Sequence, residues 1–172
     1  MATRIPTRKQ QPAAAAPTEP ATRVLRRFRL VFNSVKTHFR AVENRAGISG
    51  AQLWALSVIQ AQPGLGVGDL ARAMDVHQST ASNLLRALTE KDLVRTERAG
   101  EDRRAVQLEV TARGARALAK APGPFAGVLP DALRRLDART LARLDRDLAR
   151  LIEELGVDER GAGIPLGTAD SK

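Results

Sequence analysis

The chain has 172 residues, of which 43% are apolar and 27% charged, and this balance predicts a folded domain with a buried core. No run of about 18 apolar residues occurs, which excludes a membrane-spanning helix, so a membrane is not expected as a partner. Cysteine is absent, which excludes disulfides, thiol nucleophiles and thiolate metal sites. His38 and His77 are the only histidines, so we expect no metal and no cofactor.

An enzyme is not expected either. The sequence contains no H-E-x-x-H, no G-x-S-x-G, no P-loop and no dinucleotide-binding glycine motif after a strand. Gly64, Gly66 and Gly68 belong to a turn before a helix and lack the flanking strand. A binding protein is therefore favoured over a catalyst.

The charge balance points to a polyanionic partner. Twenty-eight Lys and Arg residues against 19 Asp and Glu leave a net charge of +9. A genomic bias toward arginine could produce part of this excess, so charge alone is only supportive. Aromatic residues make up 3% and tyrosine is missing, which disfavours the stacking platforms that hold unpaired bases. Duplex DNA is the polyanion that fits best.

The composition changes along the chain predict five segments. Both ends lack a hydrophobic period, and the first is too weakly apolar for a secretory signal, so we expect a cytoplasmic protein. The expected segments are a disordered basic arm at 1–22, an N-terminal dimerisation helix at 23–48, a DNA-binding domain at 49–120, C-terminal dimerisation helices at 121–155 and a disordered tail at 156–172.

Two helices are predicted before the middle of the chain. From Arg23 to Ala46, apolar residues recur every three or four positions, and Gly47 follows as a stop. Ser49 and Gln52 have the spacing of a capping box at the start of the second helix.

A leucine-striped helix is predicted near the C-terminus. Asp137 fits an N-cap, and leucines follow it at alternating steps of three and four residues, at positions 141, 144, 148, 151 and 155. So narrow a stripe requires a partner helix. The stripe can pack within its own subunit or against a second subunit, and we favour the second.

The middle of the chain predicts a helix-turn-helix. Leu70, Ala71 and Met74 form the inner face of a short helix, and Asp75 supplies a turn residue that tolerates a left-handed backbone. Apolar residues at 81, 84, 85 and 88 give the next helix a buried side. Its opposite side carries short polar groups and an arginine, which suit the edges of bases in a major groove: Gln78, Ser79, Ser82, Asn83 and Arg86.

A two-stranded wing is predicted next. Leu93 to Arg98 and Ala105 to Val110 have strand character, and a polar tip with Asp102, Arg103 and Arg104 lies between them. Guanidinium groups on such a hairpin can follow phosphates and enter the minor groove. A solvated charged hairpin is the alternative, which its position directly after a helix-turn-helix disfavours.

These motifs resemble the MarR family of winged-helix transcriptional regulators over about three quarters of the chain. The similarity rests on Asp102-Arg103-Arg104, which matches the family's D-x-R wing motif, on Leu108 to Gly114, which follow the family's LxVTxxG pattern, and on the run from His77 to Val94. The fold class expected is mainly α with a small β-wing, a winged helix-turn-helix with N- and C-terminal dimerisation helices. The resemblance implies a homodimeric regulator, a repressor on a palindromic operator, released by a small aromatic or anionic ligand.

Site residues follow from the motifs and the resemblance together. The resemblance places Arg104 in the minor groove, Asp102 in an ion pair that holds the wing tip, and Thr111 at the cap of the next helix. The DNA-binding residues expected are His77, Gln78, Ser79, Ser82, Asn83, Arg86, Arg98, Asp102, Arg103 and Arg104, with His77 acting as a helix cap or phosphate contact. A ligand pocket is expected near His38, Arg45 and Trp54, although a tryptophan at this point is more often part of the core.

Two positions depart from the family pattern. Asp92 stands where the family usually has glycine, which predicts some backbone strain. The stretch from Ala121 to Pro124 must break a helix that is normally continuous. An effector-independent architectural DNA-binding dimer, or a wing that binds protein, is the alternative function.

Overall fold

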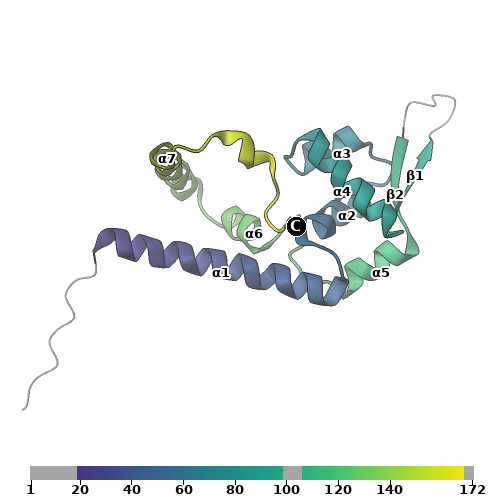
Figure 1. Cartoon of the computed structure of the whole chain (residues 1–172), viewed down its shortest axis with the longest axis horizontal. Coiled ribbons are helices and arrows are strands. Elements are labelled where there is room, and N and C mark those ends of the chain that lie inside the picture. Colours follow the sequence, from purple (N-terminus) through teal and green to yellow (C-terminus); the bar gives the residue numbers. More distant parts are fainter. Residues whose placement is uncertain (1–18, 99–105, 169–172) are drawn as a thin grey trace, which may run out of the picture.

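The computed structural model describes residues 19–98 and 106–168, which are mainly helical with one small antiparallel sheet, so the expected fold class is confirmed. The long helix α1 leads to a compact lobe that extends beyond its C-terminal end, and two further helices, α6 and α7, lie on the side of its N-terminal half (Figure 1). The elements are α1 (Pro20–Ala46), α2 (Gly50–Ala61), α3 (Val67–Ala73), α4 (Gln78–Glu90), β1 (Val94–Arg98), β2 (Val106–Val110), α5 (Ala112–Lys120), α6 (Val128–Arg134), α7 (Ala138–Leu155) and the 3-10 turn η1 (Glu159–Gly163). None of these helices is long and apolar enough to cross a membrane.

Helix α1 begins three residues earlier than predicted. Pro20 occupies its first turn, where the missing N–H of proline costs nothing, so a residue that indicated a disordered arm belongs to the helix. At the other end Gly47 adopts a φ of 70°, and its amide donates to the Glu43 carbonyl at 2.9 Å. The predicted stop at Gly47 is confirmed.

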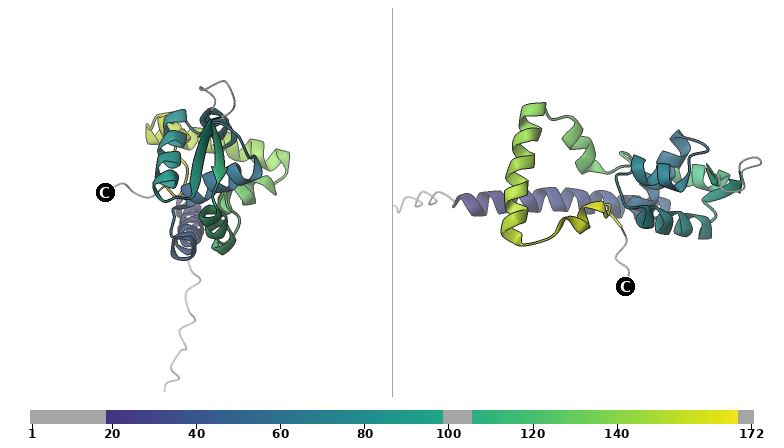
Figure 2. Two further views of the ribbon diagram at one scale, coloured as in Figure 1. Left: turned by 90° about the vertical axis from the view of Figure 1, so that its right-hand side faces the viewer. Right: turned by 90° about the horizontal axis from the view of Figure 1, so that it is seen from above.

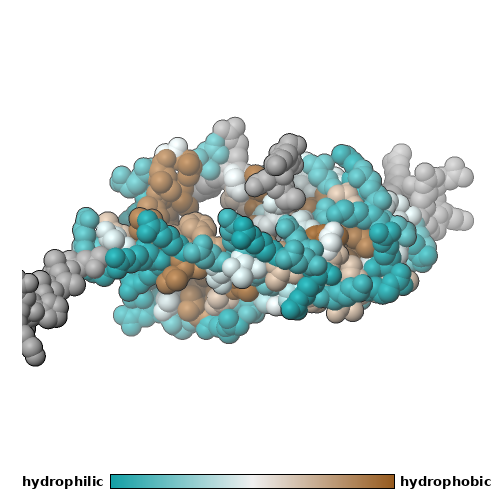
Figure 3. Space-filling view, turned by 60° about the horizontal axis from the view of Figure 1, so that its bottom comes forward, coloured by the Kyte–Doolittle hydropathy of each residue, from teal (hydrophilic) through white to brown (hydrophobic). Residues whose placement is uncertain are grey.

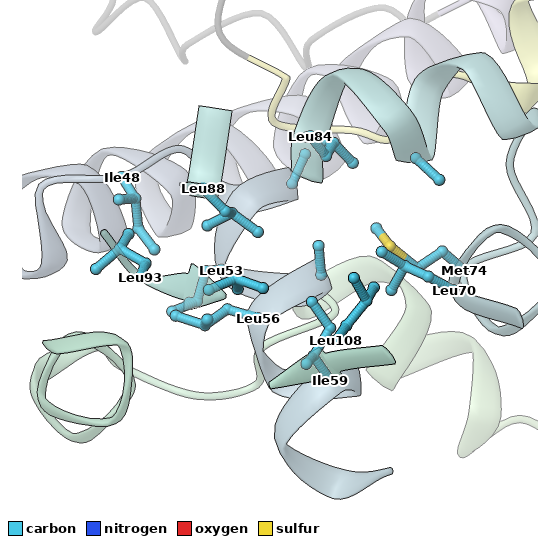
Figure 4. Close-up of a cluster of buried hydrophobic side chains, with 14 of the residues drawn as sticks. Ile48, Leu53, Leu56, Ile59, Leu70, Met74, Leu84, Leu88, Leu93 and Leu108 are labelled. Atoms are coloured by element: carbon cyan, nitrogen blue, oxygen red, sulfur yellow. The ribbon is translucent and has the colours of Figure 1, made fainter. Parts of the chain in front are cut away.

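Helix α2 lies at the centre of the lobe. The Ser49 hydroxyl accepts a hydrogen bond from the Gln52 amide at 3.3 Å, and the Gln52 side chain accepts one from the Ser49 amide at 3.2 Å, which confirms the capping box. The apolar side chains of α2 meet those of α3, α4 and β2 in one cluster (Figure 4). The side chains of this cluster that have almost no exposed surface are Val42, Leu53, Leu56, Ile59, Leu70, Met74, Leu88, Val94 and Leu108. Burial of each stabilises the fold by about 1.5–3 kcal/mol, so this cluster holds the lobe together.

Helices α3 and α4 are joined by a sharp turn. Asp75 has a φ of 52°, as its turn position predicted, and the Val76 amide donates to the Ala71 carbonyl at 3.0 Å. Ala81, Leu84 and Leu88 of α4 are buried against the rest of the lobe. This burial fixes which face of α4 points outward.

Strands β1 and β2 form the base of the wing within one residue of the predicted ranges. They pair antiparallel from Val94 opposite Val110 to Arg98 opposite Val106. The segment before α3 forms hydrogen bonds with β2. The Gly64 amide donates to the Leu108 carbonyl at 3.2 Å, and the Leu108 amide donates to the Leu65 carbonyl at 3.1 Å. The base of the wing is therefore anchored in the core of the lobe.

The predicted helix break is present. Helix α5 ends at Lys120, and a linker with a cis Gly123–Pro124 peptide bond leads to α6. Helix α7 starts where expected, with the Asp137 carboxylate accepting from the Thr140 amide at 2.9 Å. Helix α7 lies apart from α1 and runs across its direction (Figure 2).

The tail after Gly156 differs from its predicted disorder. Residues 157–168 return to the lobe, where the Ala51 amide donates to the Gly167 carbonyl at 3.3 Å. A Cβ added to Gly167 would lie 2.7 Å from the Phe39 ring, so this close approach requires glycine. Gly167 is what lets the tail pack this closely.

Candidate nucleic-acid interface

The outward face of α4 presents the polar residues that the sequence singled out. Gln78, Ser79, Asn83 and Arg86 are exposed on the side opposite the buried leucines. Within residues 19–98 and 106–168, Arg86 takes part in no ion pair, so its guanidinium is available to a partner. Amide and guanidinium groups on one helical face match the donor and acceptor pattern of base edges.

Ser82 lies on the same face but is half-buried. Its hydroxyl donates to the Gln78 carbonyl one turn earlier at 2.8 Å, which leaves its oxygen free to accept. With Arg86 and Thr96 it borders a shallow hollow of about 370 Å³ between α4 and β1. At this hollow the polar face of α4 lies next to β1, the first strand of the wing.

His77 does not cap α4 through its side chain. Its backbone occupies the N-cap position, with φ −63° and ψ 146°, but its imidazole makes no capping hydrogen bond. The ring instead lies against Gly163 of the returning tail, where an added Cβ would be 2.7 Å from Cδ2. His77 is therefore the N-cap residue of α4 but does not cap it with its side chain, and a phosphate contact by its exposed ring stays a prediction.

Charged side chains at the base of the wing pair with each other. Arg95 of β1 pairs with Glu109 of β2 at 2.6 Å and with Glu97 at 3.1 Å. The hydrogen bond that Arg95 donates to Glu109, and then the charge of Glu97, raise the pKa of Arg95 above its ordinary value. These two carboxylates neutralise Arg95, so attraction to phosphate has to come from other cations of the hairpin.

Four expected wing residues are not tested. Arg98 ends β1, and its side chain lies outside the described residues together with all of Asp102, Arg103 and Arg104. Their roles in phosphate and minor-groove contact stay predictions.

The turn that leads from α4 to the wing has the strain that the sequence predicted. Asp92 has a φ of 56°, in the left-handed region that favours glycine. The Thr111 hydroxyl donates to the Asp92 carbonyl at 2.8 Å and accepts from the Gly114 amide at 3.1 Å. Thr111 thus caps α5, as expected, and ties its start to this turn.

Arg45 lines a cavity that neither His38 nor Trp54 borders. His38 is 9% exposed on α1, and its Nε2 is buried without a hydrogen-bond partner among the described residues. Trp54 is half-buried at the edge of the core, and Arg45 lies at the end of α1. A ligand contact by these three residues stays a prediction.

A cavity of about 530 Å³ surrounds Arg45 instead. It is formed by the C-terminal end of α1, the turn after α4 and one face of α5. Its basic lining residues are Arg45, Lys91, Arg113, Arg116 and Lys120. The sequence analysis missed this cluster, although the spacing of 113, 116 and 120 on a helix without acidic residues was a usable signal.

Comparisons with known proteins support the same fold. Residues 46–105 match the model of the MarR family. The chain is similar to MepR of S. aureus in a DNA complex (20% identity, TM-score 0.54), covering 80% of this chain and 99% of that one. It is also similar to PcaV of Streptomyces coelicolor with its natural ligand (21%, 0.50, covering 84% and 99%) and to a MarR mutant from E. coli with operator DNA (18%, 0.50, covering 78% and 99%). No curated protein matches the sequence.

The family match spans the helix-turn-helix and the first strand of the wing, so it includes α4 with its exposed polar face. The fold is shared along nearly the whole length of the three solved structures. Residues 46–105 thus match the MarR family, and the whole described chain has the winged helix-turn-helix fold of the three solved structures.

Proposed function

We propose that the protein is a repressor that binds a palindromic operator as a homodimer and is released by a small ligand. The observation that carries the proposal is the exposed polar face of α4, with Asn83 and Arg86 free to meet base edges. Two such helices, about 34 Å apart in a dimer, would enter successive major grooves. The net charge of +9 supports binding to the phosphate backbone.

The wing adds a second contact. Its base is anchored in the core through Leu108, and the sequence places Arg103 and Arg104 between the two strands, where they would supply cations in addition to the paired Arg95. Arg104 would enter the minor groove that flanks the recognition site. Bound in this way across a promoter, the protein would exclude polymerase.

Uncovered apolar surface supports a dimer built from the terminal helices. Leu144, Leu151 and Leu155 of α7 are 36%, 38% and 63% exposed, and α7 packs extensively against no other described element. Leu30 and Phe32 of α1 are 70% and 64% exposed. This surface lies at the end of the molecule that carries α7 and the first half of α1 (Figure 3). A second copy would cover the exposed leucines of α7 and the exposed apolar residues of α1, because each chain carries both surfaces.

His38 supports the ligand part of the proposal. A buried nitrogen without a partner costs about 1–3 kcal/mol, which a ligand or a partner subunit would recover. Next to it along α1, a cavity of about 280 Å³ lies between Val31, Val35 and Leu129. A ligand that prefers one separation of the two recognition helices would shift the dimer away from the DNA-binding shape.

The proposal is tested by selection from random duplexes with the purified full chain. Enrichment of a two-fold symmetric sequence, with half-sites about 10 base pairs apart, is expected. Coating of every duplex with equal affinity would instead support an architectural protein, and binding to no duplex would contradict both functions.

The dimer is tested with a matched pair of variants on α7. Leu144→Glu/Leu151→Glu places two charges in the leucine stripe, and light scattering is expected to report a monomer that no longer binds the selected duplex. Ala142→Glu/Ala149→Glu adds the same charges seven residues apart on exposed positions outside the stripe and is expected to stay dimeric. Dimerisation of the first variant would contradict the assigned interface.

A further inference from the structure

The cavity of about 530 Å³ around Arg45 has a strongly one-sided charge. Five of its ten lining residues are cations and none is acidic. Its apolar surface comes from Ile48, Leu93 and Ala117, which are buried. The volume lies in the range of about 300–1,000 Å³ that small-molecule sites occupy.

Three of the cations come from one face of α5. Arg113, Arg116 and Lys120 are separated by three and four residues, so their side chains project from adjacent turns. Helix α5 has no acidic residue that could neutralise them. Like charges at this spacing repel each other and destabilise a helix, so the arrangement has a cost that an anion would remove.

The other two cations come from separate elements. Arg45 is in the last turn of α1, and Lys91 follows α4, where its ammonium donates to the Gln52 side-chain oxygen at 3.2 Å. Gln52 is neutral, so this bond holds Lys91 in place without cancelling its charge. Across the two described stretches of chain, no ion pair involves any of the five cations.

We propose that this cavity binds a compact anion that carries two or more phosphate or carboxylate groups. Arginine forks bind such groups bidentately, and three arginines from two helices surround one space. A singly charged aromatic acid would leave most of the cations unpaired. The apolar residues between the cations are themselves buried, so they offer little surface to a large hydrophobic ligand, which favours a compact one.

The cavity is separate from the DNA-binding face. None of its lining residues is among the candidate base-reading residues, which run from Gln78 to Arg86 along α4. An anion held between Arg45 and α5 would connect α1 to the lobe and so set the angle between them. The resulting effect on DNA affinity rests on the proposed function, whereas binding of the anion does not.

Calorimetry and thermal melting of the full chain without DNA test the proposal. The probes are pyrophosphate, citrate and benzoate, with the ionic strength held constant by NaCl. Pyrophosphate or citrate is expected to bind and to raise the melting temperature, with benzoate at least tenfold weaker. Preference for pyrophosphate assigns a phosphate ligand, and preference for citrate assigns a polycarboxylate.

Two variants locate the binding. Arg113→Gln/Arg116→Gln is expected to weaken the preferred anion at least tenfold. Arg146→Gln/Arg150→Gln removes the same charge from exposed positions on α7 and is expected to bind like wild type. Equal losses of anion affinity in both variants would overturn the proposal. Benzoate binding as tightly as pyrophosphate and citrate would overturn it as well.

The DNA affinity of the same variants separates this inference from the proposed function. Arg113→Gln/Arg116→Gln is expected to retain the wild-type affinity for the selected duplex in the absence of anion. Loss of DNA binding without any anion binding in the wild type would assign the cavity to the DNA interface and overturn the inference. Anion binding by a protein that recognises no duplex would support the inference while the proposed function fails.

Discussion

The contact between α5 and the base of the wing is expected to fail when one methyl group is added at Gly114. This glycine is buried in the first turn of α5, and a Cβ built on it would lie 2.2 Å from the Leu93 carbonyl oxygen and 2.8 Å from Cγ1 of Val110. The carbonyl cannot rotate away, because it accepts the Thr111 amide at 3.0 Å. Relief therefore requires α5 to move relative to the sheet.

The size of the effect follows from two opposing contributions. Overpacking of this kind costs about 1–3 kcal/mol, and the upper part of that range applies because the clashing atom belongs to the backbone. Alanine gains about 1 kcal/mol over glycine in a helix. Gly114→Ala is therefore expected to lower the free energy of unfolding by about 1–2 kcal/mol.

Gly68 provides the matched control. It also lies in the first turn of a helix, α3, but a Cβ there meets no atom within 4 Å. Gly68→Ala is expected to raise the free energy of unfolding by about 0.5–1 kcal/mol. Urea denaturation at one fixed protein concentration measures both, since the proposed dimerisation would make stability depend on concentration. A Gly114→Ala variant as stable as wild type would refute the packing described here.

Three further changes test the turn, the helix cap and the wing. Asp92→Gly is expected to raise the free energy of unfolding by about 0.5–1 kcal/mol in urea denaturation, because φ at Asp92 is 56°; a loss of stability would show that its side chain matters more than the strain. The hydrogen bond from the Thr140 side chain, and then the one from the Thr140 amide, lower the pKa of Asp137 below its ordinary value of 3.8. The stabilisation that the Asp137 carboxylate gives to the folded state is therefore present above that pH and is lost as the pH falls through the folded-state pKa. Asp137→Asn keeps the cap and is expected to melt with less pH dependence below about pH 4; an unchanged acid profile would contradict this assignment. Arg104→Ala is expected to weaken binding to the selected duplex at least tenfold by anisotropy while light scattering still shows a dimer, and undiminished affinity would count against the minor-groove role.

Local signals in the sequence predicted most of the fold. The apolar period and Gly47 predicted the end of α1. The Ser49–Gln52 pair predicted the start of α2, and Asp137 predicted the start of α7. Each of these features depends on residues within one or two turns of each other. Such patterns carry over from sequence to structure because their partners are already adjacent in the chain.

Features that depend on distant residues were harder to predict. The tail indicated disorder because it lacks a hydrophobic period, yet Gly163 and Gly167 lie against His77 and Phe39. The position of the His77 ring against the tail was not predicted, since nothing nearby in the sequence shows the tail arriving beside it.

The candidate ligand site shows the same limit. His38, Arg45 and Trp54 were grouped by residue type and by family resemblance, but the fold distributes them over separate surroundings. Arg45 instead meets cations from α5, almost 70 residues later in the chain. Only the fold brings those charges into one cavity.

The base preference of an Asn83→Ala variant tests the central claim most directly. Asn83 is exposed in the middle of the polar face of α4, so loss of its amide is expected to reduce discrimination at one contacted base pair in each half-site by about 1–3 kcal/mol. Selection from random duplexes with the variant and wild type measures this change, with Thr89→Ala near the far end of α4 as the control that keeps the wild-type preference. An Asn83→Ala protein that selects the same sequence with the same stringency would contradict the assignment of α4 as the helix that reads DNA.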